Sequence, residues 1–194
     1  EKLELAAHQG IANHVKFSAD GKLLASGGGD TMVRLWDAAT GRPLSRFSIS
    51  PTALGKVNRV AFSPDGKRLA AVDWSGAAAV FDVTSPESPQ RLATLLHHEQ
   101  QELGQIVFDV AFSPDGQYVA AAGMKGVWVW RGDEHIATPT DNASVNILFS
   151  PDSQRIIWRQ HTRGQMGIWN LESSLAETLP KPLKISGGYA FIGD

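Results

Sequence analysis

The sequence feature that most constrains the fold is a stretch that recurs along the chain. Phe17 to Asp37 (FSADGKLLASGGGDTMVRLWD) returns from Phe62 to Asp82, from Phe112 to Arg131 and from Phe149 to Asn170. The copies begin at residues 17, 62, 112 and 149, so they lie 45, 50 and 37 residues apart, and Phe191 opens a fifth copy. Self-similarity at a loose period of this size is typical of proteins built from stacked structural repeats.

Each copy carries the pattern of an antiparallel sheet. In the first copy, Asp20-Gly21 separates two apolar runs, and this dipeptide tolerates the positive φ angles of a tight hairpin turn. A third apolar run, Val33 to Trp36, follows a glycine-rich turn, and a fourth, Leu44 to Ile49, follows Thr40-Gly41. Each unit therefore predicts a four-stranded antiparallel meander.

The strands are apolar on both faces. Segments such as RLAAV and YVAAA are apolar at nearly every position, whereas a sheet with one solvated face would alternate. A sheet stacked between two others covers both faces, and its small residues allow close approach. The sequence thus predicts an all-β chain that forms a partial β-propeller. We expect blades at about residues 8–49, 56–96, 106–138 and 144–185, with the start of a further blade at 186–194.

The first copy resembles a WD repeat in Ala7-His8, Ser26, Asp30 and Leu35-Trp36-Asp37. The Phe-Ser-Pro-Asp-Gly form of the later copies is similar to the prokaryotic type of this repeat. The resemblance implies a buried, hydrogen-bonded structural tetrad of His8, Ser26, Asp30 and Trp36. A buried carboxylate and an indole N–H both need partners, so the chemistry is reasonable. Another propeller family that uses Asp-Gly hairpins, some of whose members are hydrolases, is the alternative architecture, and the tryptophans weigh against it.

The later copies keep less of the tetrad. The second copy has Ala71, Ser75 and Phe81 at the matched positions and no matching histidine, so we expect apolar packing there. The third and fourth copies keep Trp130 and Trp169 but lose the serine. Such losses do not threaten the fold, because each blade is also held by its neighbours.

The balance of charged residues bears on which kinds of partner the chain can bind. The chain has 18 basic and 20 acidic residues, a net charge of −2, and its basic residues are scattered. This distribution is not the footprint of a protein that binds nucleic acid or an anionic membrane, so we expect neither as a partner. The absence of cysteine fits a reducing compartment, and we expect the cytoplasm.

No sequence motif points to catalysis. The chain lacks a Gly-x-Ser-x-Gly elbow, a phosphate-binding loop and a His-Glu-x-x-His helix, so we expect no enzyme and no cofactor. The insertion from His97 to Gln105 (HHEQQELGQ) offers histidine and glutamate side chains, but their spacing matches no metal motif. We expect a solvated loop there and no metal site.

The resemblance implies a non-catalytic interaction scaffold that presents the loops at one end of its blades to a protein or peptide. The expected end is the one where the fourth-to-first and second-to-third strand connections emerge. Four matched positions are expected just before the first strands of the blades: His14, Arg59, Asp109 and Asn146. Three more expected contact residues lie in the second-to-third turns: Trp74, Lys125 and Arg163.

Two further expectations concern the protein as a whole. An alternative function is a sensor or regulatory propeller segment of a larger bacterial signalling enzyme, such as an ATPase, kinase or protease. A partial ring would also leave apolar blade faces open. We therefore expect association with the remainder of the propeller, or self-association of the chain.

Overall fold

The computed structural model describes residues 5, 7–50, 55–96, 106–161, 165–172 and 176–178. These residues form four four-stranded sheets and no helix. The first blade contains β1 (Ala12–Phe17), β2 (Leu23–Gly28), β3 (Met32–Asp37) and β4 (Pro43–Ser48). The second contains β5 (Val57–Phe62), β6 (Arg68–Asp73), β7 (Ala78–Asp82) and β8 (Gln90–Leu96). The third contains β9 (Val107–Phe112), β10 (Tyr118–Gly123), β11 (Gly126–Arg131) and β12 (Glu134–Thr140). The fourth contains β13 (Ser144–Phe149), β14 (Arg155–Gln160), β15 (Met166–Asn170) and β16 (Ala176–Thr178).

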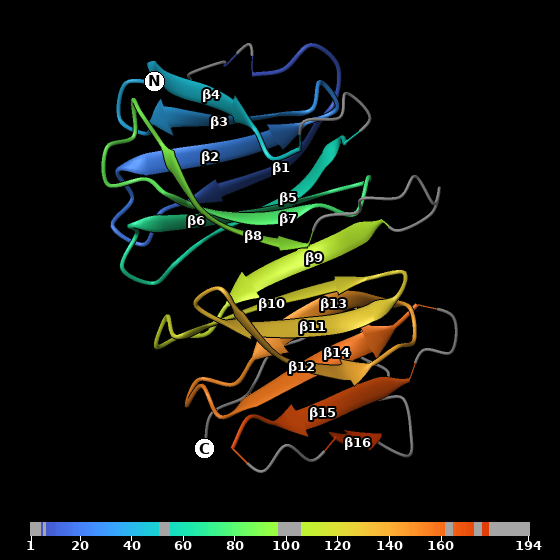
Figure 1. The fold of residues 1–194 in the computed structure, drawn as a ribbon. Helices are drawn as coiled ribbons and strands as arrows, with labels where there is room; N and C mark the ends of the chain where they lie inside the picture. Colours follow the sequence, from blue (N-terminus) through green and yellow to red (C-terminus); the bar gives the residue numbers. More distant parts are fainter. Residues whose placement is uncertain are drawn as a thin grey trace.

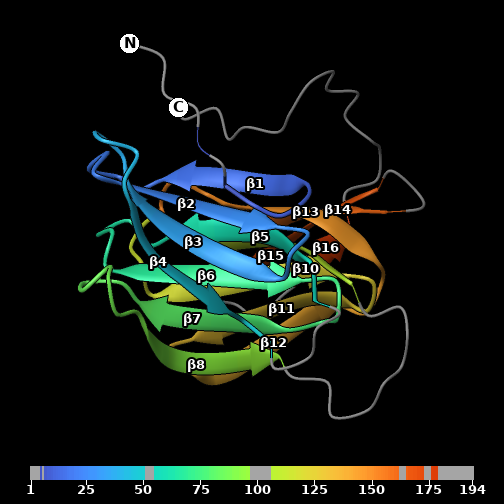
Figure 2. The ribbon, with the colours of Figure 1, turned by 90° about the horizontal axis from the view of Figure 1, so that it is seen from above.

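The sheets are stacked in chain order, from the blue first blade to the orange fourth blade (Figure 1). Within each sheet the strands pair antiparallel in sequence order, which is the predicted meander. In Figure 2 the strands β5 to β8 follow one another across the second blade. The first strands of adjacent blades contact each other, β1 with β5, β5 with β9 and β9 with β13. They form an inner column, and the fourth strands lie at the opposite edge of each sheet.

Neighbouring residues of one strand point to opposite faces and pack against different blades. In β6, Leu69 and Ala71 join the core between blades one and two, whereas Ala70 and Val72 join the core between blades two and three. A third core between blades three and four includes Ile156, Trp158 and Trp169 of the fourth blade. Blades two and three are thus covered on both faces, which explains why their strand sequences do not alternate.

The hairpins between the first and second strands require a left-handed backbone. Gly21, Gly66 and Gly116 have φ angles of 71°, 69° and 71°. The fourth copy has serine at this position, and Ser153 nevertheless adopts a φ of 60°. This conformation is strained for a residue with a Cβ atom. The hydrogen bond from the Ser153 amide to the Ser150 carbonyl helps to stabilise it in the fourth blade.

The face of the first blade that points away from the second is open among the described residues. Val15 and Phe17 on β1 are 56% and 58% exposed. Val60, the residue of blade two that matches Val15, is 2% exposed because it packs on blade one. The two exposed side chains therefore have the character of an interface position without a neighbouring blade. The described residues form no helix that is long and apolar enough to cross a membrane.

Candidate partner-binding site

The four tetrad residues form a continuous chain of hydrogen bonds in the first blade. The Trp36 indole N–H donates to Ser26 Oγ over 3.0 Å, and Ser26 Oγ lies 2.9 Å from His8 Nε2. His8 Nδ1 lies 2.7 Å from Asp30 Oδ1. Because Nδ1 faces the Asp30 carboxylate, we assign Nδ1–H as the donor to Asp30 and the Ser26 hydroxyl as the donor to Nε2. Arg34 Nη1 also lies 2.5 Å from Nδ1, and in this assignment it donates to Asp30 Oδ2. These hydrogen bonds connect the segment before β1 with β2, with the turn after β2 and with β3.

Arg34 adds a charge to this network. Its Nη1 lies 2.8 Å from the second oxygen of Asp30, and both side chains are largely buried. Burial raises the pKa of Asp30, but hydrogen bonds from His8 and Arg34 outweigh that effect, so the pKa lies below its usual value. The carboxylate is thus held ionised within the blade, and each of its oxygens has a partner.

The second blade corrects the expectation of purely apolar packing. Ala71 and Phe81 do join the apolar core, but Asp73 at the end of β6 is fully buried. Its Oδ1 accepts hydrogen bonds from the Ser75 hydroxyl at 2.8 Å and from the Ala77 amide at 2.9 Å. The sequence comparison missed this network because the aspartate has moved to the position that glycine holds in the first copy.

The third and fourth blades keep the tryptophan without the polar chain. Trp130 and Trp169 are 2% and 4% exposed. In the fourth blade, Trp158 takes the place of Ser26, and its ring lies over Gly167, where a Cβ atom would come within 2.1 Å of the indole. Glycine at 167 therefore makes room for the larger side chain.

The expected contact residues on the first strands do not lie before the strands. His14, Arg59, Asp109 and Asn146 are each the third residue of their strand, within β1, β5, β9 and β13. The register with the second strand shifts immediately before each of them, which is the mark of a β-bulge. The bulges put an additional residue into each strand, so the strands begin earlier than the apolar pattern indicates.

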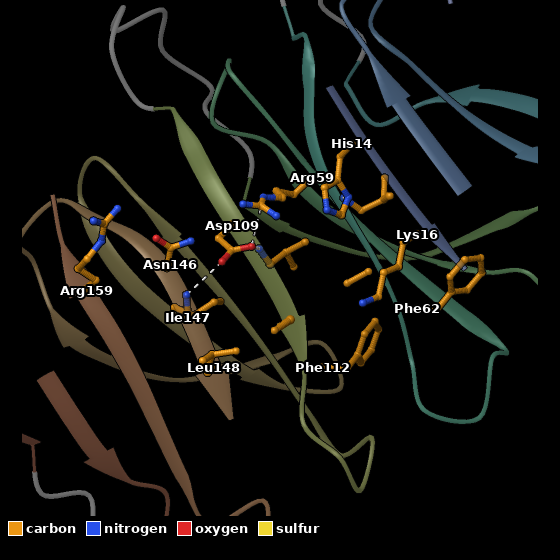
Figure 3. Close-up of a pocket in the computed structure, with 14 residues that line it drawn as sticks. His14, Lys16, Arg59, Phe62, Asp109, Phe112, Asn146, Ile147, Leu148 and Arg159 are labelled. Carbon is orange, nitrogen blue, oxygen red and sulfur yellow. Dashed lines mark hydrogen bonds and ion pairs between the residues drawn. The ribbon is translucent and has the colours of Figure 1, made fainter. Parts of the chain in front are cut away.

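The four matched residues line one hollow of about 640 Å³ on the inner column (Figure 3). Phe62, Phe112 and Leu148 also line it, at or next to the C-terminal ends of their strands. The hollow also contains Lys16 and Arg159, which sequence reasoning did not single out. The signal for Lys16 was present, because it lies two residues beyond His14 on β1 and so shares its face.

Asp109 ties three blades together at this hollow. Its Oδ2 accepts the Ile147 amide of blade four at 3.1 Å, and its Oδ1 lies 3.6 Å from Arg59 Nε of blade two. On the other side, His14 Nδ1 accepts the Val60 amide of the next blade at 3.4 Å. The Asp109 carboxylate is therefore occupied within the wall, while the Arg59 side chain remains 38% exposed.

The electrostatics of the hollow reflect burial and positive neighbours. Burial raises the pKa of Asp109, and Arg59 and the amide hydrogen bonds offset part of this rise. Burial, followed by the charges of Arg59 and Lys16, lowers the pKa of His14 to about 4. At neutral pH the imidazole is therefore uncharged and can accept the Val60 amide.

The turns next to this hollow carry exposed apolar side chains. Trp74 is 46% exposed in the turn after β6, with Lys56 Nζ 5.3 Å from its ring centroid. Met124, at the matched position of blade three, is 39% exposed and was missed by sequence reasoning. Each turn is held to the segment before the first strand by a bond from the Trp74 or Met124 amide. Lys125 is exposed beside Met124.

Two expected features lie outside the described residues: Arg163, and the insertion from residue 97 to 105. The start of a further blade at 186–194 lies outside them as well. Within the part of the chain that the structure describes, no group of three or more metal-ligating side chains comes together.

Comparison with known proteins places this architecture. The family pattern of the WD domain, G-beta repeat, matches residues 1–37, 43–82 and 89–130, more than half of the chain. The chain belongs to the WD40 family. The WD40 pattern covers the first two blades and most of the third, and it stops before the fourth copy, where the serine and aspartate of the tetrad are absent.

Solved WD40 folds agree. The structure of U3-55K superposes with a TM-score of 0.74 at 19% identity, covering 90% of this chain and 53% of the other. The crystal structure of the RRP9 WD40 repeats gives a TM-score of 0.71 at 20% identity. At this identity the likeness shows the fold alone, which confirms the predicted propeller.

Curated WD40 relatives are longer than the matched part. Eukaryotic translation initiation factor 3 subunit I from Candida albicans is 32% identical over 130 residues, which are 63% of this chain and 36% of the relative. The Protein LST8 homolog from Drosophila melanogaster is 29% identical over 80% of this chain and 50% of the relative. Both relatives are eukaryotic, so they support neither the expected prokaryotic type of repeat nor the bacterial signalling alternative.

Proposed function

We propose that this chain is part of a non-catalytic interaction scaffold whose inner hollow and adjacent turns bind a protein or peptide. The observation that carries the proposal is the pair of exposed side chains, Trp74 and Met124, at matched turn positions of adjacent blades. Both turns lie at the end of the strands where Arg59 and Asp109 line the hollow. Interfaces draw much of their energy from a few aromatic and arginine side chains, often with methionine nearby.

The relatives support this reading at a coarse level. One carries the name of a subunit of a translation initiation factor, which is a protein within a multi-protein assembly. The opposite end of the blades offers less variety, because it repeats the same hairpin with an aspartate hydrogen-bonded to its own turn. The end of the blades that carries Trp74 therefore offers a partner more side chains by which this protein differs from other propellers.

The test is affinity capture with the full-length protein, followed by calorimetry with the captured partner. We expect Trp74→Ala and Arg59→Ala each to weaken binding by about 2 kcal/mol or more. Lys67→Ala and Gln117→Ala change exposed residues in the opposite hairpin turns, and Leu92→Ala removes an exposed apolar side chain from β8. These three controls should bind normally, and a loss of the partner only with Lys67→Ala or Gln117→Ala would place the interface at the opposite end.

We also propose that the open face of blade one is covered in the whole protein by a further blade of the same propeller. The support is the exposure of Val15 and Phe17 at positions that are buried or partly buried in the next blade, together with the greater length of the relatives. The cytoplasm remains our proposed location, on the absence of cysteine.

A further inference from the structure

Cationic side chains outnumber carboxylates among the described residues that line the hollow. Lys16 and Arg59 lie on the adjacent strands β1 and β5, Arg159 lies on β14, and Asp109 is the one acidic residue of this lining. His14 is uncharged at neutral pH. The chain as a whole carries a net charge of −2, so this concentration of positive charge is local. A concave wall of one sign attracts groups of the opposite sign more strongly than a flat surface does.

The Asp109 carboxylate is largely buried. It is 14% exposed, its Oδ2 accepts the Ile147 amide, and its Oδ1 lies 3.6 Å from Arg59 Nε. The Arg59 side chain is 38% exposed and lines the hollow (Figure 3). Lys16 is exposed on the neighbouring strand β1. An anionic group that enters the hollow therefore meets Arg59 on β5 and Lys16 on β1, two adjacent first strands.

Apolar side chains lie beside the charged ones. Trp74 and Met124 stand exposed at the adjacent turns, and Phe62 and Phe112 line the inner wall. A volume of about 640 Å³ accommodates a few side chains rather than a folded domain. A long polyanion such as RNA fits less well, because the charges lie inside a confined hollow and the chain around it is net acidic.

We propose that the partner segment is an acidic peptide, with a glutamate or aspartate side chain placed between Arg59 and Lys16 and apolar residues on Trp74 and Met124. This inference deepens the proposed function and rests on it. Asp109 places a competing negative charge beside Arg59. Asp109→Asn removes that charge, so its effect should have the opposite sign from the removal of the cations.

The experiment uses the full-length protein and fluorescence anisotropy with two labelled peptides, one alternating glutamate and leucine and one alternating glutamine and leucine. We expect the glutamate peptide to bind and the glutamine peptide to bind about tenfold or more weakly. Arg59→Gln and Lys16→Gln should each weaken the glutamate peptide about three- to tenfold, in line with charged hydrogen bonds at a partly exposed site. Asp109→Asn should strengthen it, and Lys67→Gln, at the opposite hairpin, should change nothing.

The outcomes separate the inference from the function on which it rests. Equal binding of both peptides would overturn the acidic preference and leave the scaffold in place. Binding of neither peptide would overturn the inference, whereas the scaffold proposal is decided independently by the captured partner. Tighter binding of a labelled oligouridylate than of the glutamate peptide would also overturn it. Denaturant midpoints of the variants show which of them are folded, and Lys16→Gln changes an exposed side chain whose loss leaves the core intact.

Discussion

The carboxylate of Asp73 occupies, in the second blade, the space that the His8 ring occupies in the first. A Cβ atom on Gly28, which matches Asp73, would come within 2.3 Å of the His8 ring. In blade two, a Cβ atom on Gly55 would meet Asp73 Oδ2 at 2.0 Å. The polar group thus comes from the segment before the first strand in one blade and from the second strand in the next.

Asp73 should make the protein less stable as the pH rises. Burial raises its pKa above 3.8, and Oδ2 has no hydrogen-bond partner among the described residues. The folded chain therefore binds a proton more tightly than the unfolded chain, so the contribution of Asp73 is full below pH 3.8 and is lost as the pH rises through the folded-state pKa. Asp73→Asn should remove this trend from urea midpoints measured between about pH 3.5 and pH 7.

Asp65→Asn is the control of opposite sign. Hydrogen bonding from Ser63 lowers the pKa of Asp65, so its contribution is lost as the pH falls. For each variant, the urea midpoint of the parent protein minus that of the variant is plotted against pH. The two plots should slope in opposite directions, and the same slope for Asp73→Asn and Asp65→Asn would show that the pKa of Asp73 is not raised.

Loss of the Asp30 carboxylate should destabilise the first blade. Asp30→Ala strands His8 and the largely buried Arg34, which costs roughly 1–3 kcal/mol or more. Asp65→Ala removes a hairpin-turn side chain and should cost less than about 1 kcal/mol, by analogy with other local caps. Denaturant titration of the two variants compares them directly, and equal midpoints would show that the tetrad contributes nothing particular.

Gly28 should be intolerant of a methyl group although its backbone is ordinary. In Gly28→Ala, the new Cβ collides with the His8 ring and must push it away from Asp30 and Ser26. We expect a loss of about 1–3 kcal/mol in the free energy of unfolding, from stranded buried partners. Gly29→Ala is the matched control, since its Cβ would lie 3.6 Å from the nearest atom. Thermal unfolding that left both variants alike would contradict the close packing of His8.

The open face of blade one should make the isolated 194-residue chain associate. Exposed apolar side chains on an unpartnered sheet favour pairing, so sedimentation velocity should show species larger than the monomer at increasing concentration. Val15→Glu combined with Phe17→Glu should reduce this association. Leu92→Glu combined with Ile136→Glu changes two exposed apolar residues on the outer strands and should leave it intact. A parent chain that stayed monomeric would argue against an open interface.

The repeat by itself determined the propeller. The period of the copies, their Asp-Gly hairpins and the strands that are apolar at nearly every position are local properties of the sequence, and together they predict a stack of meanders. The tetrad residues could be named from the first copy through its resemblance to a WD repeat, because that copy keeps all four. The spacing of the copies alone puts His14, Arg59, Asp109 and Asn146 at matched positions.

Tertiary structure decided what those positions do. The bulges shift the register of the first strands, and no local pattern reports them, so the matched residues lie inside strands rather than in loops. The pairing of Arg59 with Asp109 depends on the distance between two blades 50 residues apart in sequence, and so does the burial that raises the pKa of Asp109. Asp73 and Met124 have no distinguishing pattern, because exposure and desolvation arise only when neighbouring blades pack.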